Sequence, residues 1–287
     1  MLANVQKFLP KSVYERCATA TDCRKTLKAG LVIVLALWAS NSLFAQTLSD
    51  TGKEQRWAEQ VIDTLFDGEP VWLEADGHEF LAIEMESFKG NKGRGVIVIH
   101  GIGIHPNWDS VIRPLRVGLT NHGWHTLSIQ MSILPNDAES AEYLPLLDEV
   151  AGRINAAIDY LHAQGQPQIV IAAHSLGATM TMRYMGDVPN APVSALVLIG
   201  MQGGAESVHD NAAALEHINL PVLDIYGSDD LPGVVNFANR KAAAANAGAN
   251  ANFQQIAVDG ADHFFTDLDD TLVNTVSEWL TDAMSPL

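Results

Sequence analysis

The stretch Gln168–Ala178 constrains this chain more than any other, because it passes from an apolar run into a helical one through a serine. Its first part is largely apolar and β-branched, as in a buried strand of a parallel sheet. Ser175 follows at the turn, and residues 178–185 have helical composition. This order predicts a nucleophile elbow, whose strained serine needs small residues two positions before and after it. Gly177 meets that need and Ala173 stands in place of the usual glycine, so a plain turn with a capping serine is the alternative.

Residues 1–45 have the layout of a secretory signal rather than that of a folded domain. Six basic residues precede an apolar run from Ala29 to Ala39, and small residues follow up to Ala45. The apolar run is too short to span a bilayer comfortably. We therefore expect cleavage after Ala45, a mature chain of residues 46–287 that forms a single domain, and a periplasmic or secreted location. The alternative is an uncleaved anchor in the inner membrane, formed by residues 29–45.

The charge of the mature chain limits the classes of partner that it can bind, and its cysteine content decides whether it can form disulfides. The full sequence has 17 Lys and Arg against 34 Asp and Glu, a formal net charge of −17. Without residues 1–45 these numbers become 11 and 32, a net charge of −21, and such a surface repels nucleic acid and anionic membranes. Both cysteines, Cys17 and Cys23, lie in the expected signal, so the mature chain can form no disulfide. The sequence leaves the oligomeric state open.

Beyond the signal, the sequence alternates between strand and helix patterns. A helix from about Ser49 to Phe66 precedes two strand-like runs that flank Asp76-Gly77, a strong hairpin signal. Later apolar runs alternate with helical segments. We therefore predict an α/β fold, with a mostly parallel eight-stranded sheet, an N-terminal antiparallel hairpin and helices on both faces. The expected strands are 71–74, 79–85, 96–100, 124–130, the run before Ser175, 195–199, 222–226 and 253–258, and the expected later helices are 108–122, 142–164, 178–185, 234–245 and 268–284.

Over roughly residues 70–285 the chain resembles the α/β hydrolases, with the elbow on the fifth strand, where that family has it. The segment Gly101–Trp108, with His122-Gly123-Trp124 downstream, is more particular. It resembles a group of exported bacterial α/β-hydrolase-like proteins of unknown function. The resemblance implies the α/β-hydrolase fold and an exported location, but it brings no substrate with it.

A serine hydroxyl is a poor nucleophile at neutral pH and needs a neighbouring base that is itself oriented by an acid. In α/β hydrolases the chain order is nucleophile, acid, base. The resemblance places the acid three residues past Gly227, at Asp230, with Asp229 as the close competitor. It places the base after the last strand, at His263. Asp224 lies within a strand, and a buried hydrogen-bond network is the better interpretation of its carboxylate.

The developing negative charge of such a reaction needs two backbone N–H groups aimed at it. We expect one from Leu176, directly after the nucleophile and at the positive end of its helix. The resemblance to the family's His-Gly loop implies that Ile102 supplies the second. His105 in the same loop could line the pocket or pack the loop, and His174 is expected to be structural. The reaction requires no cofactor, and the absence of zinc-ligand spacing leads us to expect no metal.

Together these matches favour a serine hydrolase that forms an acyl-enzyme on a small-molecule or lipid-like ester. Carboxylesterase or lipase activity is favoured over a coenzyme A thioesterase, because the acidic exported chain lacks a basic patch. Only 22 residues lie between Ile199 and Val222, which disfavours a large lid there, and residues 131–143 could line the pocket instead. The alternative is a non-catalytic periplasmic binding or envelope protein that retains the hydrolase fold.

Overall fold

The computed structural model describes residues 48–287 except 91, 205–208 and 285–287. Thr47–Leu287 form one compact unit by their internal contacts. The expected signal and the alternative anchor at residues 29–45 lie outside the described residues. Within the described part of the chain, no helix is both long and apolar enough to cross a bilayer.

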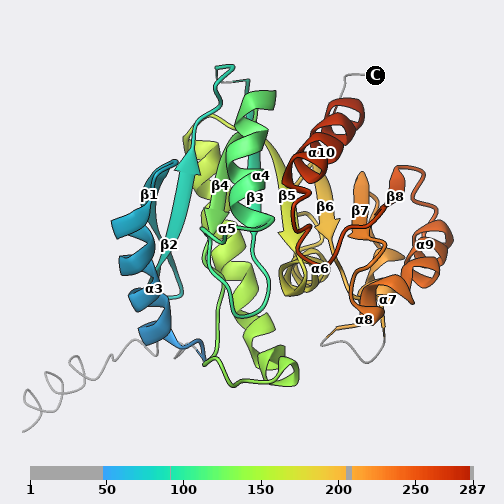
Figure 1. The fold of residues 1–287 in the computed structure, drawn as a ribbon, viewed down its shortest axis with the longest axis horizontal. Helices are drawn as coiled ribbons and strands as arrows, with labels where there is room; N and C mark the ends of the chain where they lie inside the picture. Colours follow the sequence, from blue (N-terminus) through green and yellow to red (C-terminus); the bar gives the residue numbers. More distant parts are fainter. Residues whose placement is uncertain (1–47, 91, 205–208, 285–287) are drawn as a thin grey trace, which may run out of the picture. The chain divides into compact units, whose positions relative to one another are not determined.

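One eight-stranded sheet forms the centre of the fold (Figure 1), in the order β1-β2-β4-β3-β5-β6-β7-β8. The first two strands pair antiparallel, β2 pairs antiparallel with β4, and all later neighbours pair in parallel. The strands are β1 (Glu69–Ala75), β2 (His78–Met85), β3 (Arg94–Ile99), β4 (His125–Ile129), β5 (Gln168–His174), β6 (Ala195–Ile199), β7 (Val222–Gly227) and β8 (Phe253–Val258). This arrangement confirms the predicted fold class.

The β1–β2 hairpin forms where the Asp-Gly pair predicted it. Asp76 and Gly77 both have positive φ, 54° and 82°, as a tight two-residue hairpin turn requires. Ala75 therefore pairs directly with His78, and the register carries the hairpin to the edge of the parallel strands.

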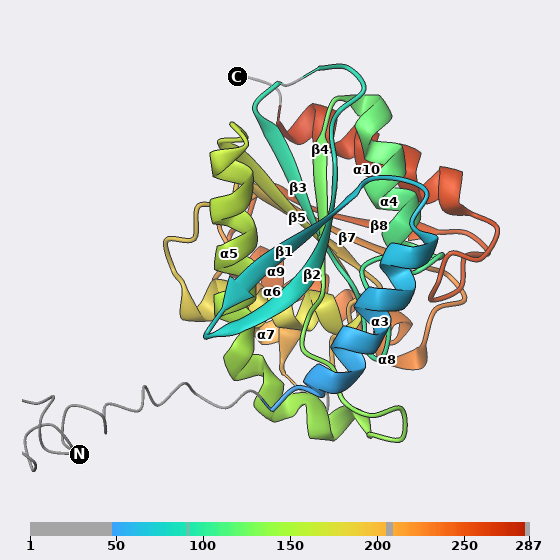
Figure 2. The same cartoon turned by 90° about the vertical axis from the view of Figure 1, so that its left-hand side faces the viewer.

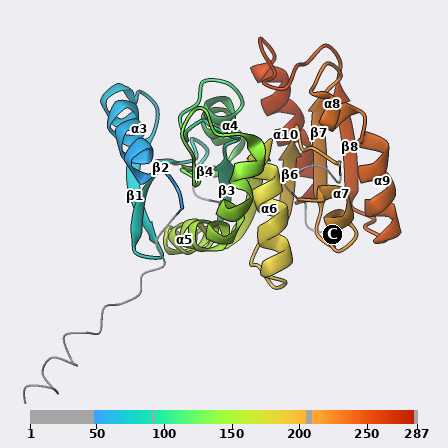
Figure 3. The same ribbon diagram turned by 90° about the horizontal axis from the view of Figure 1, so that it is seen from below.

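Helices cover both faces of the sheet (Figure 3). Because side chains alternate along a strand, Ile97 and Ile99 of β3 pack on one face and Val96 and Val98 on the other. The first face is covered by α5, α6, α7 and α9, and the second by α3, α4 and α10. The helices are α3 (Thr51–Thr64), α4 (Ile112–Gly118), α5 (Val150–Ala163), α6 (Leu176–Asp187), α7 (Asn211–Leu215), α8 (Pro232–Val235), α9 (Ala238–Ala247) and α10 (Asp269–Ala283), with the 3₁₀ segments η1 (Leu119–His122) and η2 (Ser140–Glu149).

Three expected helices differ from the observed ones. The helix expected over 234–245 is divided into α8 and α9, with Asn236 and Phe237 between them. The helix expected from residue 108 begins only at Ile112, after a turn in which Val111 adopts a positive φ of 62°. The helix expected over 142–164 is divided into η2 and α5. Pro145 lies inside η2, and proline removes a backbone donor and clashes with the preceding turn of an α-helix. A 3₁₀ segment therefore replaces the expected first part of that helix.

Helix α3 packs beside the hairpin (Figure 2), on Leu81 and Ile83 of β2. Its N-cap is Asp50, whose side chain accepts a hydrogen bond from the Lys53 N–H at 2.9 Å. The helix ends at Thr64, so Phe66 lies beyond it and is 91% exposed rather than on the buried side. A buried ion pair at 2.9 Å joins Glu54 of α3 to Arg153 of α5.

Candidate active site

The turn between β5 and α6 has the geometry of a nucleophile elbow. Ser175 lies at φ 54° and ψ −118°, a strained conformation for a residue with a Cβ, of the kind that functional sites retain. A Cβ at Gly177 would lie 2.5 Å from the His100 carbonyl oxygen, so only glycine fits there. The methyl group of Ala173 is fully buried in the core beside its β3 partner Ile99. The departure from the usual glycine is therefore accommodated by packing.

Three side chains from different loops meet at this turn. Ser175 Oγ lies 2.9 Å from His263 Nε2, and His263 Nδ1 lies 2.6 Å from Asp230 Oδ1. Each residue is at most 9% exposed. Because the carboxylate can only accept, Nδ1 carries the hydrogen, which leaves Nε2 able to take the serine proton. The structure thus brings together the three residues that the sequence singled out, at the carboxyl ends of β5, β7 and β8.

The position of Asp230 distinguishes it from its neighbour. The Leu231 N–H donates to Asp230 Oδ1 at 2.6 Å, which holds the carboxylate against the imidazole. Asp229 is exposed, and its backbone N–H donates to the Ala261 carbonyl at 3.0 Å. Only Asp230 therefore contacts His263 among these two acids.

Gly200 is a site residue that the sequence analysis missed. It follows β6 at φ 58°, and a Cβ there would lie 3.0 Å from both Cε1 and Nδ1 of His263 and 3.3 Å from Asp230 Oδ2. A side chain would press on the histidine–aspartate pair in a backbone conformation that already favours glycine. A glycine directly after a buried strand was the signal available in the sequence.

The two expected oxyanion donors lie beside the serine. Leu176 begins α6, where backbone N–H groups have no intrahelical acceptor, and Ile102 lies in the loop after β3. Both line the same pocket as Ser175. Among the described residues, neither backbone N–H has a hydrogen-bond partner. A Cβ at Gly101 would lie 3.1 Å from Ser175 Cβ, so glycine lets this loop approach the nucleophile.

Two buried histidines hold the loops around the site. His100 Nδ1 donates to the Gly101 carbonyl at 2.8 Å, and its Nε2 accepts from the Met131 N–H at 2.9 Å. His174 Nε2 donates to the His263 carbonyl at 2.9 Å. Burial lowers the pKa of His100 to about 3 and that of His174 to about 4. Both rings are therefore neutral near pH 7, and they position the loop after β3 and the backbone of His263 without titrating.

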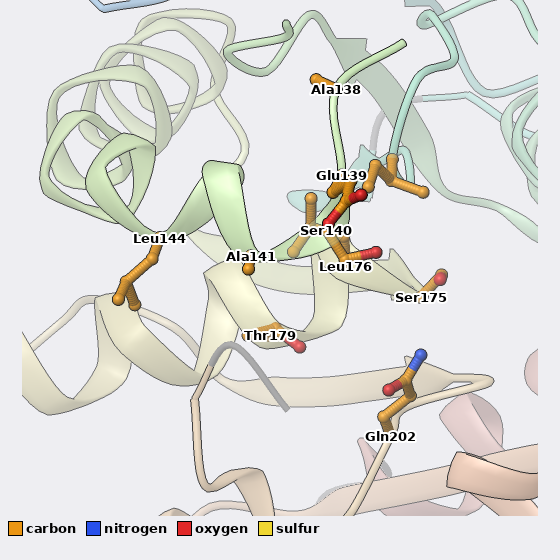
Figure 4. A pocket seen from close by; sticks show the side chains of 10 residues that line it. Ala138, Glu139, Ser140, Ala141, Leu144, Ser175, Leu176, Thr179 and Gln202 are labelled. Atoms are coloured by element: carbon orange, nitrogen blue, oxygen red, sulfur yellow. The ribbon is translucent and has the colours of Figure 1, made fainter. Parts of the chain in front are cut away.

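A pocket of about 730 Å³ opens beside Ser175 (Figure 4). Its lining is mixed. Leu144 of η2 and Ile102 are apolar and partly exposed, and Thr179, one helical turn after Ser175, and Gln202 from the loop after β6 are polar. Residues 138–141 complete the wall, in the segment that the sequence suggested as a pocket lining.

Two residues weighed from the sequence lie away from this pocket. His105 does not line it and instead packs against Trp57 and Trp108. Asp224 is fully buried, accepts from Lys241 Nζ at 2.8 Å and from Gln255 Nε2 at 2.7 Å, and forms the expected internal network. Within the described ranges, no group of three or more His, Cys, Asp or Glu side chains could hold a metal ion.

The sheet order, the elbow and the convergence of loops define an α/β hydrolase fold. Solved structures with this fold resemble the chain at low sequence identity. Est1E from Butyrivibrio proteoclasticus shares 17% identity at a TM-score of 0.58, over 77% of this chain and 100% of that one. The esterase Pf2001 from Pyrococcus furiosus shares 16% sequence identity at a TM-score of 0.59, over 78% of this chain and 96% of that one. XC6422 from Xanthomonas campestris, described as a serine hydrolase without a lid, shares 14% sequence identity at a TM-score of 0.57, over 77% of this chain and 97% of that one.

A family model gives the more particular assignment. The model described as protein of unknown function (DUF3530) matches residues 42–145 and 135–282. The chain belongs to this family. A comparison with curated proteins gave no significant match.

Proposed function

We propose that this protein is a serine hydrolase that cleaves carboxylic esters through an acyl-enzyme. The observation that carries the proposal is the continuous chain of contacts from Ser175 Oγ to His263 Nε2 and from His263 Nδ1 to Asp230. Such a relay lets the imidazole remove the serine proton while the carboxylate stabilises the imidazolium. The fold of the esterase-like solved structures supports the same class.

The reaction proceeds in two steps. Ser175 Oγ attacks the ester carbonyl as His263 Nε2 takes its proton, and the carbonyl oxygen becomes an oxyanion that the N–H groups of Leu176 and Ile102 stabilise. The tetrahedral intermediate collapses, His263 gives the proton to the leaving alkoxide, and the acyl group stays on Ser175. Water, activated by the same imidazole, then releases the acid.

The pocket supports a small or medium-sized ester substrate. Its volume of about 730 Å³ lies in the range of small-molecule sites. Leu144 and Ile102 provide apolar contact for an acyl or alcohol chain, and Gln202 offers hydrogen bonds. Thr179 Oγ1 already accepts from Asn211 Nδ2 at 2.8 Å. A neutral ester with one apolar chain fits this mixed lining.

Reaction with a fluorophosphonate probe, followed by turnover of p-nitrophenyl esters of increasing chain length, tests the proposal. We expect covalent labelling at Ser175 and highest kcat/KM for a short or medium acyl chain. A wild-type protein that took no probe and hydrolysed no ester would instead support a binding protein that keeps the hydrolase fold.

We further propose that residues 1–45 are a cleaved secretory signal and that residues 46–287 act in the periplasm or outside the cell. The basic, apolar and small-residue order of the segment supports this. The described domain begins its first hydrogen bonds at Leu48, whose N–H donates to Glu149 Oε1. Cleavage after Ala45 would therefore keep every described element intact.

A further inference from the structure

A second cavity, of about 540 Å³, lies between α3 and the loop that follows β3. None of the described residues that line it also lines the pocket beside Ser175. We call it the indole cavity, and its lining includes Trp57, Gln60, His105, Asn107, Trp108 and Asp109. Three of these, His105, Asn107 and Trp108, belong to the segment Gly101–Trp108 and have no part in the proposed reaction.

Aromatic rings form the apolar part of the indole cavity. The ring of His105 lies 5.4 Å from that of Trp57 and 5.4 Å from that of Trp108, edge to face in both cases. Both indoles are only partly buried, and neither ring N–H has a partner among the described residues. Both indoles therefore leave ring surface open in the cavity, where a ligand can contact it.

Two hydrogen-bond donors in the cavity are fixed in orientation. The Asn107 backbone N–H donates to His105 Nδ1 at 3.2 Å, so the hydrogen of the neutral ring lies on Nε2. Burial lowers the pKa of His105 and keeps that ring neutral. The fully buried Arg116 donates to Asn107 Oδ1 at 2.5 Å and to the Asp67 carbonyl at 2.5 Å. The Asn107 amide therefore keeps its two N–H donors for a ligand.

The hydrogen-bond acceptors and the charged groups of the indole cavity show which classes of ligand it disfavours. Asp109 is exposed at the cavity and carries a carboxylate that can only accept, and Gln60 adds an amide. A simple anion is disfavoured by Asp109 and by the net charge of −17. A quaternary ammonium offers no acceptor to the donors of His105 and Asn107. In addition, Lys53 Nζ already lies 4.5 Å from the centre of the Trp57 ring.

We propose that the indole cavity binds a neutral saccharide. A pyranose ring offers hydroxyl oxygens to His105 Nε2–H and the Asn107 amide, hydroxyl hydrogens to Asp109, and apolar C–H faces to the two indoles. A cavity of this volume holds about one to three sugar rings and combines apolar walls with a few oriented polar groups, as ligand sites do. The site is separate from the serine, and its occupancy does not depend on esterase activity.

Isothermal titration calorimetry of the purified protein with a panel of neutral di- and trisaccharides tests the site. These saccharides are built from glucose, galactose, mannose, xylose or N-acetylglucosamine units. Choline chloride serves as the cationic probe and sodium glucuronate as the anionic probe. We expect at least one neutral saccharide to bind with a Kd of about 10 µM to 1 mM, and neither charged probe to bind. The proposal is overturned if no neutral saccharide binds at a concentration 10-fold above the upper Kd, or if choline binds and the saccharides do not.

Variants separate the indole cavity from other surfaces. Trp108→Ala should weaken saccharide binding at least tenfold, because an aromatic anchor is removed. Asp109→Ala changes an exposed side chain without disturbing the core, and it should also weaken binding at least tenfold. Trp72→Ala, at a 50% exposed tryptophan outside the cavity, is the matched control and should bind as the wild type does. Saccharide binding that survived both cavity substitutions would place the sugar elsewhere and refute the site.

Discussion

At the scale of single residues, the site depends on backbone positions that few side chains tolerate. Ser175 has a positive φ. An added Cβ would meet the His100 carbonyl oxygen at Gly177 and the His263 imidazole at Gly200. These constraints project Ser175 Oγ toward His263 and leave the histidine free to face Asp230. Strain of this kind persists because the surrounding β5 and α6 fix the backbone on both sides.

Ser175→Ala should remove the esterase activity without greatly lowering the stability of the fold. Loss of the nucleophile should abolish probe labelling and reduce ester turnover by roughly a millionfold, as for deletion of a triad serine in subtilisin. Loss of one hydroxyl at a turn costs about 1 kcal/mol or less, so the melting temperature should change little. Parallel assays of turnover and thermal unfolding check both statements. Substantial residual esterase activity in the variant would refute the assignment of the nucleophile.

Asp230→Asn should lower turnover by about 10⁴-fold, because an asparagine favours the wrong histidine tautomer. Asp229→Asn is the matched control: it makes the same chemical change one residue away, on an exposed side chain, and should cost less than threefold. Steady-state kinetics of both variants on one ester decide between them. A large loss in the Asp229 variant together with a small one in the Asp230 variant would reassign the acid.

The buried histidines predict a stability change in mild acid. Burial holds the folded pKa of His174 at about 4 and that of His100 at about 3, against about 6.5 for an unfolded histidine. Between these values the unfolded chain binds more protons, so the free energy of unfolding falls as the pH decreases below 6.5 and is fully retained above it.

Urea unfolding at pH 7, 6 and 5 measures this dependence. His174→Gln keeps an N–H donor for the His263 carbonyl but cannot titrate, so its unfolding free energy should fall less steeply, by at most about 1.4 kcal/mol per pH unit relative to wild type. The range above pH 5 largely avoids the carboxylates, which titrate lower. Equal slopes for the two proteins would contradict the buried neutral state of His174.

At the scale of elements, the sequence predicted the strands well because each is a short apolar run between turn signals, and the eight observed strands follow those runs. It also predicted that Ser175, Asp230 and His263 follow the ends of β5, β7 and β8, from the chain order that the family resemblance supplied. It could not predict the turn before Ile112, because the positive φ of Val111 depends on packing. Pro145, in contrast, was a signal in the sequence that an α-helix would not begin before η2 ends, and the prediction overlooked it. Composition also gave no sign that His105 would face α3 instead of the serine.

Helix α3 holds the wall of the pocket from outside the site. The Ile133 N–H donates to Ser49 Oγ at 2.7 Å, and Lys53 Nζ donates to the Leu134 carbonyl at 2.7 Å. The segment that these bonds hold continues directly into residues 138–141, which line the pocket. The start of the domain therefore fixes a loop more than eighty residues later in the chain.

Ser49→Ala should loosen this wall. The buried Ile133 N–H would lose its acceptor, which costs about 1–3 kcal/mol, and the pocket segment would become less well positioned. We expect a lower melting temperature and a KM raised severalfold at nearly constant kcat. Thr64→Ala, which removes an exposed hydroxyl at the other end of α3, serves as the control. An unchanged KM and melting temperature for Ser49→Ala would show that α3 does not support the pocket.

At the scale of the whole molecule, charge is distributed unevenly along the chain. Six of the 17 basic residues lie in residues 1–45, so the remainder has a net charge of −21. A surface with that charge favours solubility and disfavours anionic partners. The two cysteines also lie in the first 45 residues, so the rest of the chain can form no disulfide in any compartment. These properties suit a domain that works after export.

The exported protein should begin at Gln46. Signal cleavage requires small residues before the cut and a short apolar run, and Ala45 and residues 29–39 provide them. N-terminal sequencing of the protein from the periplasmic fraction of an exporting bacterial host measures the start directly. Ala45→Arg places a large charged residue at the cut and should leave a longer, membrane-associated product, whereas Asp50→Asn, five residues further on, should be processed normally. A membrane-bound wild-type product that retained residues 1–45 would establish the anchor and would place the hydrolase domain at the membrane surface.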